Sequence, residues 1–235
     1  MSHPVIVTRT QPGADETAAG LAALGYRPIV SPMLRIVETG LAAEALEGVR
    51  DIVFTSANGV RAFTAARAGE TAAFAAWCVG PSTAEAAREA GFTPVVESDG
   101  DAAALAGLIL ARRDDLSGPL LHIANKAAAG QLVAALQAGG LEARFAAPYR
   151  TEAAPALSSE ALEVLTSGSR CAVLVHSAKA ADALAASQPP LAHAVIAAIS
   201  EAAAEPLAHL PAAARAIAAR PNEAALMAAL KSALA

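Results

Sequence analysis

The chain has 235 residues, of which 55% are hydrophobic and only 3% aromatic, and its formal net charge is −5. The high apolar content excludes a disordered protein, and an acidic balance without a Lys/Arg cluster argues against nucleic-acid binding. The length allows one large domain or two domains of roughly 100 residues each.

The sequence carries no visible targeting signal. Its first ten residues, MSHPVIVTRT, have neither a charged n-region nor an apolar core, and no apolar run approaches the roughly 18–20 residues that span a bilayer. Cys78 and Cys171 both lie in apolar, strand-like runs, which favours buried, reduced thiols over a disulfide. We therefore expect a cytoplasmic protein that binds neither membranes nor nucleic acid.

Short apolar runs alternate with longer Ala/Leu-rich stretches of helical period. This alternation is typical of βαβ units, whose parallel strands form a sheet covered by helices on both faces. Gly25, Gly69, Gly91 and Gly139/Gly140 follow helical stretches, as glycines at helix C-termini do. The expected strand–helix pairs are residues 4–7 and 13–25, 51–54 and 57–69, 76–80 and 82–91, 119–124 and 129–140, 171–175 and 178–187, and 194–199 and 201–210.

The two halves of the chain also resemble each other, in the order A–B–A′–B′. An internal duplication explains this likeness; the alternative is that Ala-rich α/β sequences look alike. The aligned pairs are Pro4/Pro119, Gly25/Gly140, Ser56/Ser177 and Gly80/Ser200.

Residues 31–40 and 147–155 interrupt the alternation, because each has a Pro after a strand and no helical period. They are typical of crossings between domains. We predict an α/β protein with two parallel-sheet domains, helices on both faces, and a two-stranded β ladder as the hinge. Domain 1 is residues 1–34 plus 152–235, domain 2 is residues 38–147, and the crossing linkers are residues 33–38 and 148–152.

Small hydroxyl and amide side chains follow the predicted strands, at the corners where helices begin. In parallel sheets these corners share the carboxyl-end edge, where ligands bind. Ordinary helix capping explains each residue, and Ser82 with Glu85 matches the S-x-x-E capping box. Alternatively, exposed helix N-termini bind a ligand with several carboxylates or phosphates in an interdomain cleft. The corner residues are Thr8, Thr10, Thr55, Ser56, Ser82, Thr83, Asn125, Ser177 and Ser200.

Four other residues lie near the corners or crossings. Arg9 and Arg150 are the nearest cations, and each is a candidate to hold an anion or a solvated surface residue. His176 is a polar cleft residue or a histidine satisfied by backbone. Tyr149 has a hydroxyl able to donate a proton, and hinge packing is its alternative role.

Other chemistries lack their motifs. The chain has no phosphate-binding G-x-x-x-x-G-K-[ST], no dinucleotide-binding G-x-G-x-x-G and no G-x-S-x-G nucleophile elbow. Its five histidines show no metal-ligand spacing, so no metal site is expected.

Over nearly its whole length, the chain resembles the uroporphyrinogen-III synthase family. Order and spacing carry the resemblance, because no single motif is specific. The matching stretches are VIVTRTQPGADETAAGLAALGYRPIVSPML, DIVFTSANGVRAF, CVGPSTAEAAREAGFTPVVES, LLHIANKAAAGQLVAALQAGGLEARFAAPYRT and VLVHSAKAA.

The resemblance implies two α/β domains, an active site in the cleft and no cofactor. The reaction would be dehydration and closure of the linear tetrapyrrole hydroxymethylbilane with inversion of its last ring, a lyase step of heme biosynthesis. Tyr149 falls on the family's cleft tyrosine, which is thought to help the hydroxyl leave. The expected substrate-binding residues are Thr8, Arg9, Thr55, Ser56, Asn58, Ser82, Thr83, Asn125, Lys126, His176, Ser177 and Ser200.

The second half departs from the family pattern in three places. Ser200 and Ala203 replace the Gly and Thr of the second G-x-x-T corner, VHSAKA replaces an F-T-S corner, and the loop with Lys126 lacks an Arg. Two rival functions stay open: a two-lobed protein that binds a small anion without catalysis, and a nucleotide-binding module. We expect a monomer.

Overall fold

The computed structural model describes residues 2–128 and 130–234. Both chain ends and Ala129, the first residue of the helix expected at 129–140, lie outside the described residues. The chain divides into two compact units, Met1–Ile36 with Thr151–Ala235 (unit 1) and Val37–Arg150 (unit 2).

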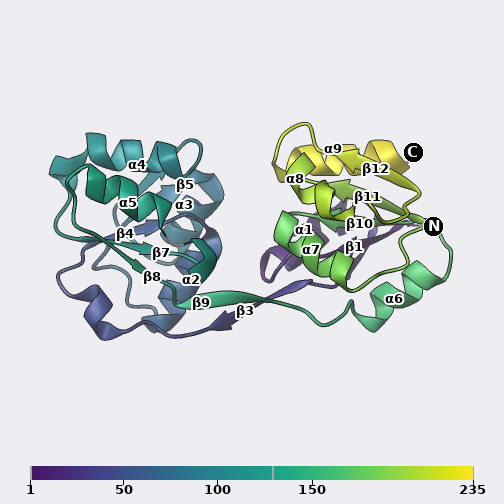
Figure 1. Ribbon diagram of the computed structural model, residues 1–235, viewed down its shortest axis with the longest axis horizontal. Helices are drawn as coiled ribbons and strands as arrows, with labels where there is room; N and C mark the ends of the chain where they lie inside the picture. Colours follow the sequence, from purple (N-terminus) through teal and green to yellow (C-terminus); the bar gives the residue numbers. More distant parts are fainter. Residues whose placement is uncertain (1, 129, 235) are drawn as a thin grey trace. The chain divides into compact units, whose positions relative to one another are not determined.

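The expected fold class is confirmed. Each unit contains a five-stranded parallel sheet with helices on both faces (Figure 1). A separate two-stranded antiparallel ladder pairs β3 (Leu34–Glu38) with β9 (Tyr149–Ala153). The boundaries between the units fall inside these two strands.

Unit 1 forms sheet A, whose strands all run parallel in the order β12-β11-β10-β1-β2. Side chains alternate between its faces: Val5 and Val7 pack with α1 and α9, whereas Ile6 packs with the core beside α6 and α7. The elements are β1 (Pro4–Val7), α1 (Gly13–Ala23), β2 (Arg27–Val30), α6 (Ser159–Thr166), β10 (Cys171–Val175), α7 (Ala178–Ala186), β11 (Ala194–Ala198), α8 (Glu201–Ala204), the 3₁₀ turn η4 (Glu205–Leu207), β12 (Ala214–Ile217) and α9 (Glu223–Leu234).

Unit 2 forms sheet C, parallel in the order β6-β5-β4-β7-β8. Phe54, Phe63 and Phe92 make edge-on and tilted ring contacts under α2 and α3, and Trp77 packs on the opposite face with α4 and α5. The elements are η1 (Ala43–Leu46), β4 (Asp51–Phe54), α2 (Ala57–Ala66), β5 (Ala75–Val79), α3 (Gly80–Glu89), β6 (Val95–Ser98), α4 (Ala102–Ala111), η2 (Arg113–Asp115), β7 (Leu120–Ile123), η3 (Lys126–Ala128), α5 (Gln131–Ala138) and β8 (Ala143–Ala146).

The two sheets repeat each other down to the strand register. Val5 pairs with Ala172 in sheet A, and the residues aligned with them, Leu120 and Asp51, pair with each other in sheet C. The A segment of each half therefore completes the sheet of the other half's B segment. This shared register favours an internal duplication over a chance likeness of Ala-rich sequences.

The repeat extends into the ladder. The Thr39 N–H donates to the Pro148 carbonyl (2.8 Å), and the Ala154 N–H donates to the Met33 carbonyl (2.9 Å). Under the same alignment the two donors, Thr39 and Ala154, are equivalent, and so are the two acceptors, Pro148 and Met33. Leu34 of β3 therefore corresponds to Tyr149 of β9.

Helix ends follow the glycine pattern, whereas two helices depart from expectation. Gly25, Gly69, Gly91 and Gly140 all have positive φ after a helix, where glycine alone fits without strain. The single helix expected at 201–210 is instead α8 followed by η4. Pro206 lies at this break, where its ring removes a backbone donor. Helix α3 begins at Gly80, two residues earlier than expected.

Helix α2 packs so closely on β7 that it leaves no space for a side chain at Gly59. A Cβ there would lie 2.8 Å from the Ile123 carbonyl oxygen, whereas a Cβ at Gly107 of α4 would meet nothing within 4 Å. We expect Gly59→Ala to lower the free energy of unfolding by about 1–3 kcal/mol, because overpacking outweighs the better helix propensity.

Gly107→Ala is the matched control within the same unit and should raise the free energy of unfolding by about 0.5–1 kcal/mol. Urea titrations of both variants measure the two effects. Equal stabilisation by both substitutions would contradict the close packing of α2 on β7.

Candidate active site

Three strand-to-helix corners are closed by serine N-caps. The Ser56 hydroxyl accepts a hydrogen bond from the Asn58 N–H (3.1 Å) at the start of α2. The Ser177 hydroxyl accepts one from the Ala180 N–H (3.2 Å) in α7, and that of Ser200 accepts one from the Ala203 N–H (3.3 Å) in α8. Because all strands are parallel, each cap lies at the carboxyl-end edge of its sheet. The capping interpretation is therefore confirmed for these three serines.

The capping box expected at Ser82 is wrong. Ser82 lies inside α3, whose N-cap is Val79 with no side-chain cap. Gly80 has a φ of +70° and Pro81 occupies the first turn, a position that tolerates proline because its missing N–H has no helical partner. The helix therefore starts before the serine. Ser82 is exposed and Thr83 is buried in the same turn.

Tyr149, Ser56 and Asn125 meet at the carboxyl-end edge of sheet C. Tyr149 opens β9 and is only 4% exposed. Its hydroxyl is hydrogen-bonded to the Ser56 side chain and to the backbone of Asn125. Burial raises the pKa of the Tyr149 phenol, and these two hydrogen bonds lower it in part. The phenol is therefore protonated at neutral pH and is suited to donate a proton.

Other predicted residues of unit 2 lie next to Ser56 and Asn125 along the chain. The Thr55 hydroxyl lies 3.4 Å from Nε2 of His122, and the Asn58 carboxamide oxygen accepts a hydrogen bond from Arg61 (3.5 Å). Lys126 is exposed in η3, directly after Asn125. The edge thus carries several hydroxyl and amide groups, of which the Ser56 side chain and the Asn125 backbone contact the Tyr149 phenol.

The predicted residues of unit 1 lie at the carboxyl-end edge of sheet A. The Thr8 hydroxyl is fully buried and donates to the Leu174 carbonyl (2.7 Å), so it ties β1 to β10. Arg9 follows Thr8, and His176 follows β10 immediately before the Ser177 cap. This edge differs from its counterpart in unit 2, because its cation is paired with a carboxylate.

Arg9 and His176 both contact Glu223, the first residue of α9. His176 Nε2 lies 3.1 Å and Arg9 Nη1 3.8 Å from the same carboxylate oxygen, Oε2. The Thr17 hydroxyl of α1 donates to the other oxygen, Oε1 (2.9 Å). Burial raises the pKa of Glu223, but the hydrogen bonds and charges of these neighbours outweigh it, and the net pKa is lowered.

Three of these residues, Glu223, Thr17 and His122, are not apparent as site residues from the sequence. Glu223 and Thr17 lie on helices, with no motif around them, and only the folded chain brings them to Arg9 and His176. His122 lies within a strand, and the alignment of the two halves places no polar side chain opposite it. Finding all three would have required the arrangement in space of the strands and of the helices that pack on them.

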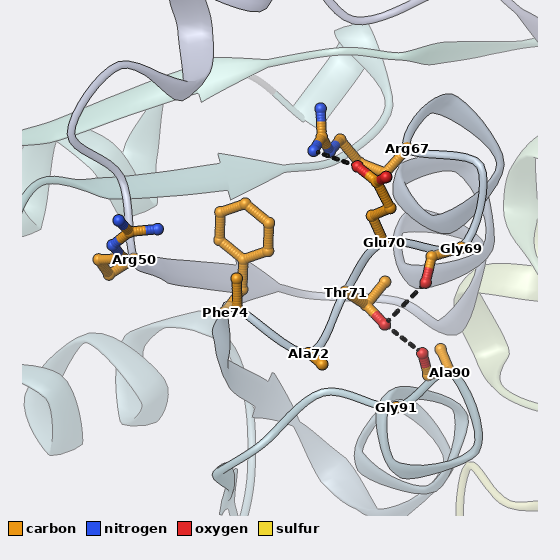
Figure 2. A pocket seen from close by; sticks show the side chains of 10 residues that line it. Arg50, Arg67, Gly69, Glu70, Thr71, Ala72, Phe74, Ala90 and Gly91 are labelled. Atoms are coloured by element: carbon orange, nitrogen blue, oxygen red, sulfur yellow. Dashed lines mark hydrogen bonds and ion pairs between the residues drawn. The ribbon is translucent and has the colours of Figure 1, made fainter.

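A cavity of about 570 Å³ lies at the opposite, amino-end edge of unit 2. Its lining residues come from the segment before β4, the α2–β5 connection and the end of α3 (Figure 2). Arg67 is paired there with Glu70 (3.0 Å), and the Thr71 hydroxyl is bonded to the carbonyls of Gly69 and Ala90. The Glu70 carboxylate and the Thr71 hydroxyl are thus both engaged within the protein.

Neither a metal-binding cluster nor a membrane-spanning helix occurs among residues 2–128 and 130–234. No three His, Cys, Asp or Glu side chains in these ranges gather in a way that would hold a metal ion. None of the helices in the described part of the chain has the length and apolar character to cross a bilayer. Cys78 and Cys171 are both buried, free thiols, and burial raises the pKa of Cys78 to about 12.

Comparisons with known proteins identify the family. The family model described as uroporphyrinogen-III synthase HemD matches residues 15–228. A crystal structure of uroporphyrinogen-III synthetase from Helicobacter pylori 26695 is 16% identical and aligns over 99% of each chain with a TM-score of 0.66. A mutant uroporphyrinogen III synthase from the extremely thermophilic bacterium Thermus thermophilus is 19% identical over 99% of each chain, with a TM-score of 0.53. At these identities the two structures show a shared fold. No curated protein sequence matches this chain significantly.

His122 gives the protein a pH-dependent stability. Its side chain is 2% exposed, and burial lowers its pKa from 6.5 to about 4. As the pH falls, His122 therefore binds a proton near pH 6.5 in the unfolded chain but only near pH 4 in the folded chain. This contribution is fully present above pH 6.5 and is lost as the pH falls towards 4; at most it amounts to about 3 kcal/mol.

We expect His122→Leu to flatten the decline of unfolding free energy between about pH 6.5 and 5, a range above most carboxylate titrations. Urea unfolding at several pH values compares the slopes of variant and wild type. An unchanged slope in a folded variant would show that another group is responsible.

Proposed function

The chain belongs to the uroporphyrinogen-III synthase family, and we propose that it closes hydroxymethylbilane to uroporphyrinogen III, with loss of water and inversion of ring D. The reaction is a step of tetrapyrrole and heme biosynthesis. One observation supports placing the reaction at particular residues: the Tyr149 hydroxyl is buried and hydrogen-bonded to the Ser56 side chain and the Asn125 backbone.

Tyr149 acts as the general acid. The bond between the terminal methylene carbon and its hydroxyl oxygen breaks, driven by the lone pair of the pyrrole nitrogen, and the electron pair leaves with the oxygen. Tyr149 donates its phenolic proton to that oxygen, so that water departs. The raised pKa keeps the proton available, and the hydrogen bonds to Ser56 and Asn125 stabilise the phenolate that remains.

Positioning determines which isomer forms. Closure in free solution gives the wrong isomer, so the enzyme must fold the chain until the substituted carbon of ring D attacks first, through a spiro intermediate. Helix N-termini at the carboxyl-end edges present amide N–H groups to the substrate's carboxylates. The residues assigned to this binding are Thr8, Arg9, Thr55, Ser56, Asn58, Ser82, Thr83, Asn125, Lys126, His176, Ser177 and Ser200.

The remaining assignments follow from the same function. The enzyme is a carbon–oxygen lyase and acts as a cytoplasmic monomer on a small-molecule substrate, without nucleic-acid or membrane partners. The net charge of −5 supports the absence of a nucleic-acid partner. The two free, buried thiols support a reducing compartment such as the cytoplasm. Each compact unit corresponds to one domain, and the chain crosses between them within residues 33–38 and 148–152.

Product analysis tests the function directly. Purified protein is given hydroxymethylbilane, the products are oxidised to porphyrins, and chromatography separates isomer I from isomer III. We expect isomer III to dominate with the protein and isomer I without it. Isomer I alone in both samples would overturn the proposal.

Tyr149→Phe tests the general acid. The substitution removes one hydroxyl from a buried ring, so we expect turnover to fall roughly 100-fold, the lower end for loss of a general acid. The product should remain isomer III, because positioning does not depend on the phenolic proton. Initial rates and isomer ratios measure both outcomes.

Tyr26→Phe is the matched control, since Tyr26 is the other tyrosine of the chain and lies between α1 and β2. Its turnover should equal that of wild type. Full turnover in a folded Tyr149→Phe variant would exclude the proton-donor role.

A further inference from the structure

The carboxylate of Glu223 gathers three side chains from other elements of unit 1. Its Oε2 lies 3.1 Å from His176 Nε2 and 3.8 Å from Arg9 Nη1, and its Oε1 accepts a hydrogen bond from Thr17 (2.9 Å). The Arg9 Nη1 also donates to Thr17 (3.4 Å). The four side chains therefore form one continuous polar cluster at the carboxyl-end edge of sheet A.

The carboxylate fixes the proton position on His176. An ionised carboxylate only accepts hydrogen bonds, so the imidazole nitrogen that faces it must carry the proton. In the neutral ring this leaves Nδ1 bare. Within the described part of the chain, Nδ1 of His176 is buried and has no hydrogen-bond partner. The ring is held by Nε2 alone, and its Nδ1 is enclosed by the protein.

His176 is the buried end of the cluster, and Arg9 and Glu223 are its more exposed end. The side chain of His176 is 8% exposed, whereas those of Arg9 and Glu223 are 34% and 42% exposed. Arg9 also lies against the start of α1, because a Cβ at Gly13 would be 2.5 Å from its Nε. The guanidinium is thus held between the Glu223 carboxylate and the backbone of Gly13, and part of it still faces solvent.

The other half of the repeat shows that the fold does not require this cluster. Under the alignment of the two halves, Ala124 stands where unit 1 has Arg9, and Thr55 stands where it has His176. Helix α4, the counterpart of α9, begins with Ala102 rather than a glutamate. The same sheet and helices form without counterparts of these charges, which argues for a functional role.

We propose that Glu223 is a positioning residue: held by His176 and Thr17, it keeps the Arg9 guanidinium in place to receive one carboxylate of the substrate. This inference rests on the proposed function, because that substrate carries its carboxylates on a linear tetrapyrrole. Glu223 does not touch the substrate itself; it orients the guanidinium that does. Arg9 supplies charge and a planar set of donors, which suit a carboxylate.

Glu223→Gln tests the inference with two readouts. The carboxamide has nearly the same size, but it is neutral and places an N–H₂ donor beside His176 or Thr17. We expect the KM for hydroxymethylbilane to rise about tenfold, as for loss of one charge-assisted hydrogen bond, with kcat changed less than about twofold. In ¹⁵N NMR of the histidine rings, the Nε2 and Nδ1 resonances of His176 should shift from their wild-type positions, because the ring loses its charged carboxylate acceptor.

Glu160→Gln is the matched control. Glu160 also lies in the first turn of a unit 1 helix, α6, and pairs with an arginine, Arg27, at 3.3 Å. That pair is on the surface and away from His176, so both readouts should equal those of wild type. Similar thermal unfolding of the two variants would show that both are folded.

The outcomes separate this inference from the proposed function. A wild-type protein that forms no isomer III would overturn the proposed function, while the NMR readout would still report whether Glu223 holds the His176 ring. A wild type that forms isomer III, with an unchanged KM and an unchanged His176 spectrum in Glu223→Gln, would overturn the positioning role alone. A rise in KM with both glutamine variants would also overturn it.

Discussion

Parallel pairing of the strands is the constraint on which the polar groups at the carboxyl-end edge of each sheet depend. In sheet C, Phe54 lies opposite Ile123, so the segments that follow β4 and β7 leave the sheet at the same level. Ser56 and Asn125, two residues beyond each strand, therefore come within reach of one side chain, Tyr149. A slip of one residue in this register would separate the serine from the loop and turn alternate side chains to the other face.

The two units share one architecture but differ in the chemistry at their carboxyl-end edges. Unit 2 presents a buried phenol with hydroxyl and backbone partners, whereas unit 1 presents Arg9, His176 and Glu223. The difference has a physical consequence. A cation beside the phenol would lower its pKa, and a carboxylate beside it would raise the pKa further. The acidity of Tyr149 is instead determined by burial and two hydrogen bonds.

The fold was predictable from the sequence because its signals are local and repeated. Alternating apolar and helical stretches identify parallel sheets, and the repeated order of the halves identifies the interleaved units. Tyr149, Ser56 and Asn125 were predicted one by one, since each follows a strand or lies in a crossing. Their mutual hydrogen bonds depend on the register, which a pattern of residue types does not contain.

Other features were beyond the sequence for identifiable reasons. Glu223 opens the C-terminal helix and is 206 residues from Thr17, so no motif connects them. The Ser82 capping box failed because Gly80, with its positive φ, and Pro81 let α3 start earlier than the serine. A long-range contact determines the first feature, and backbone geometry overrides a short pattern in the second.

In the ladder, the two halves of the repeat differ by one polar group at an equivalent buried position. Leu34 and Tyr149 are equivalent residues of β3 and β9, and both are buried. The fold therefore already encloses a large side chain at this position, and the tyrosine adds one hydroxyl to it. A buried hydroxyl without a partner would destabilise the unit, but the Ser56 cap and the Asn125 backbone already lie beside it. The groups that stabilise the fold thus also determine the acidity of the Tyr149 hydroxyl.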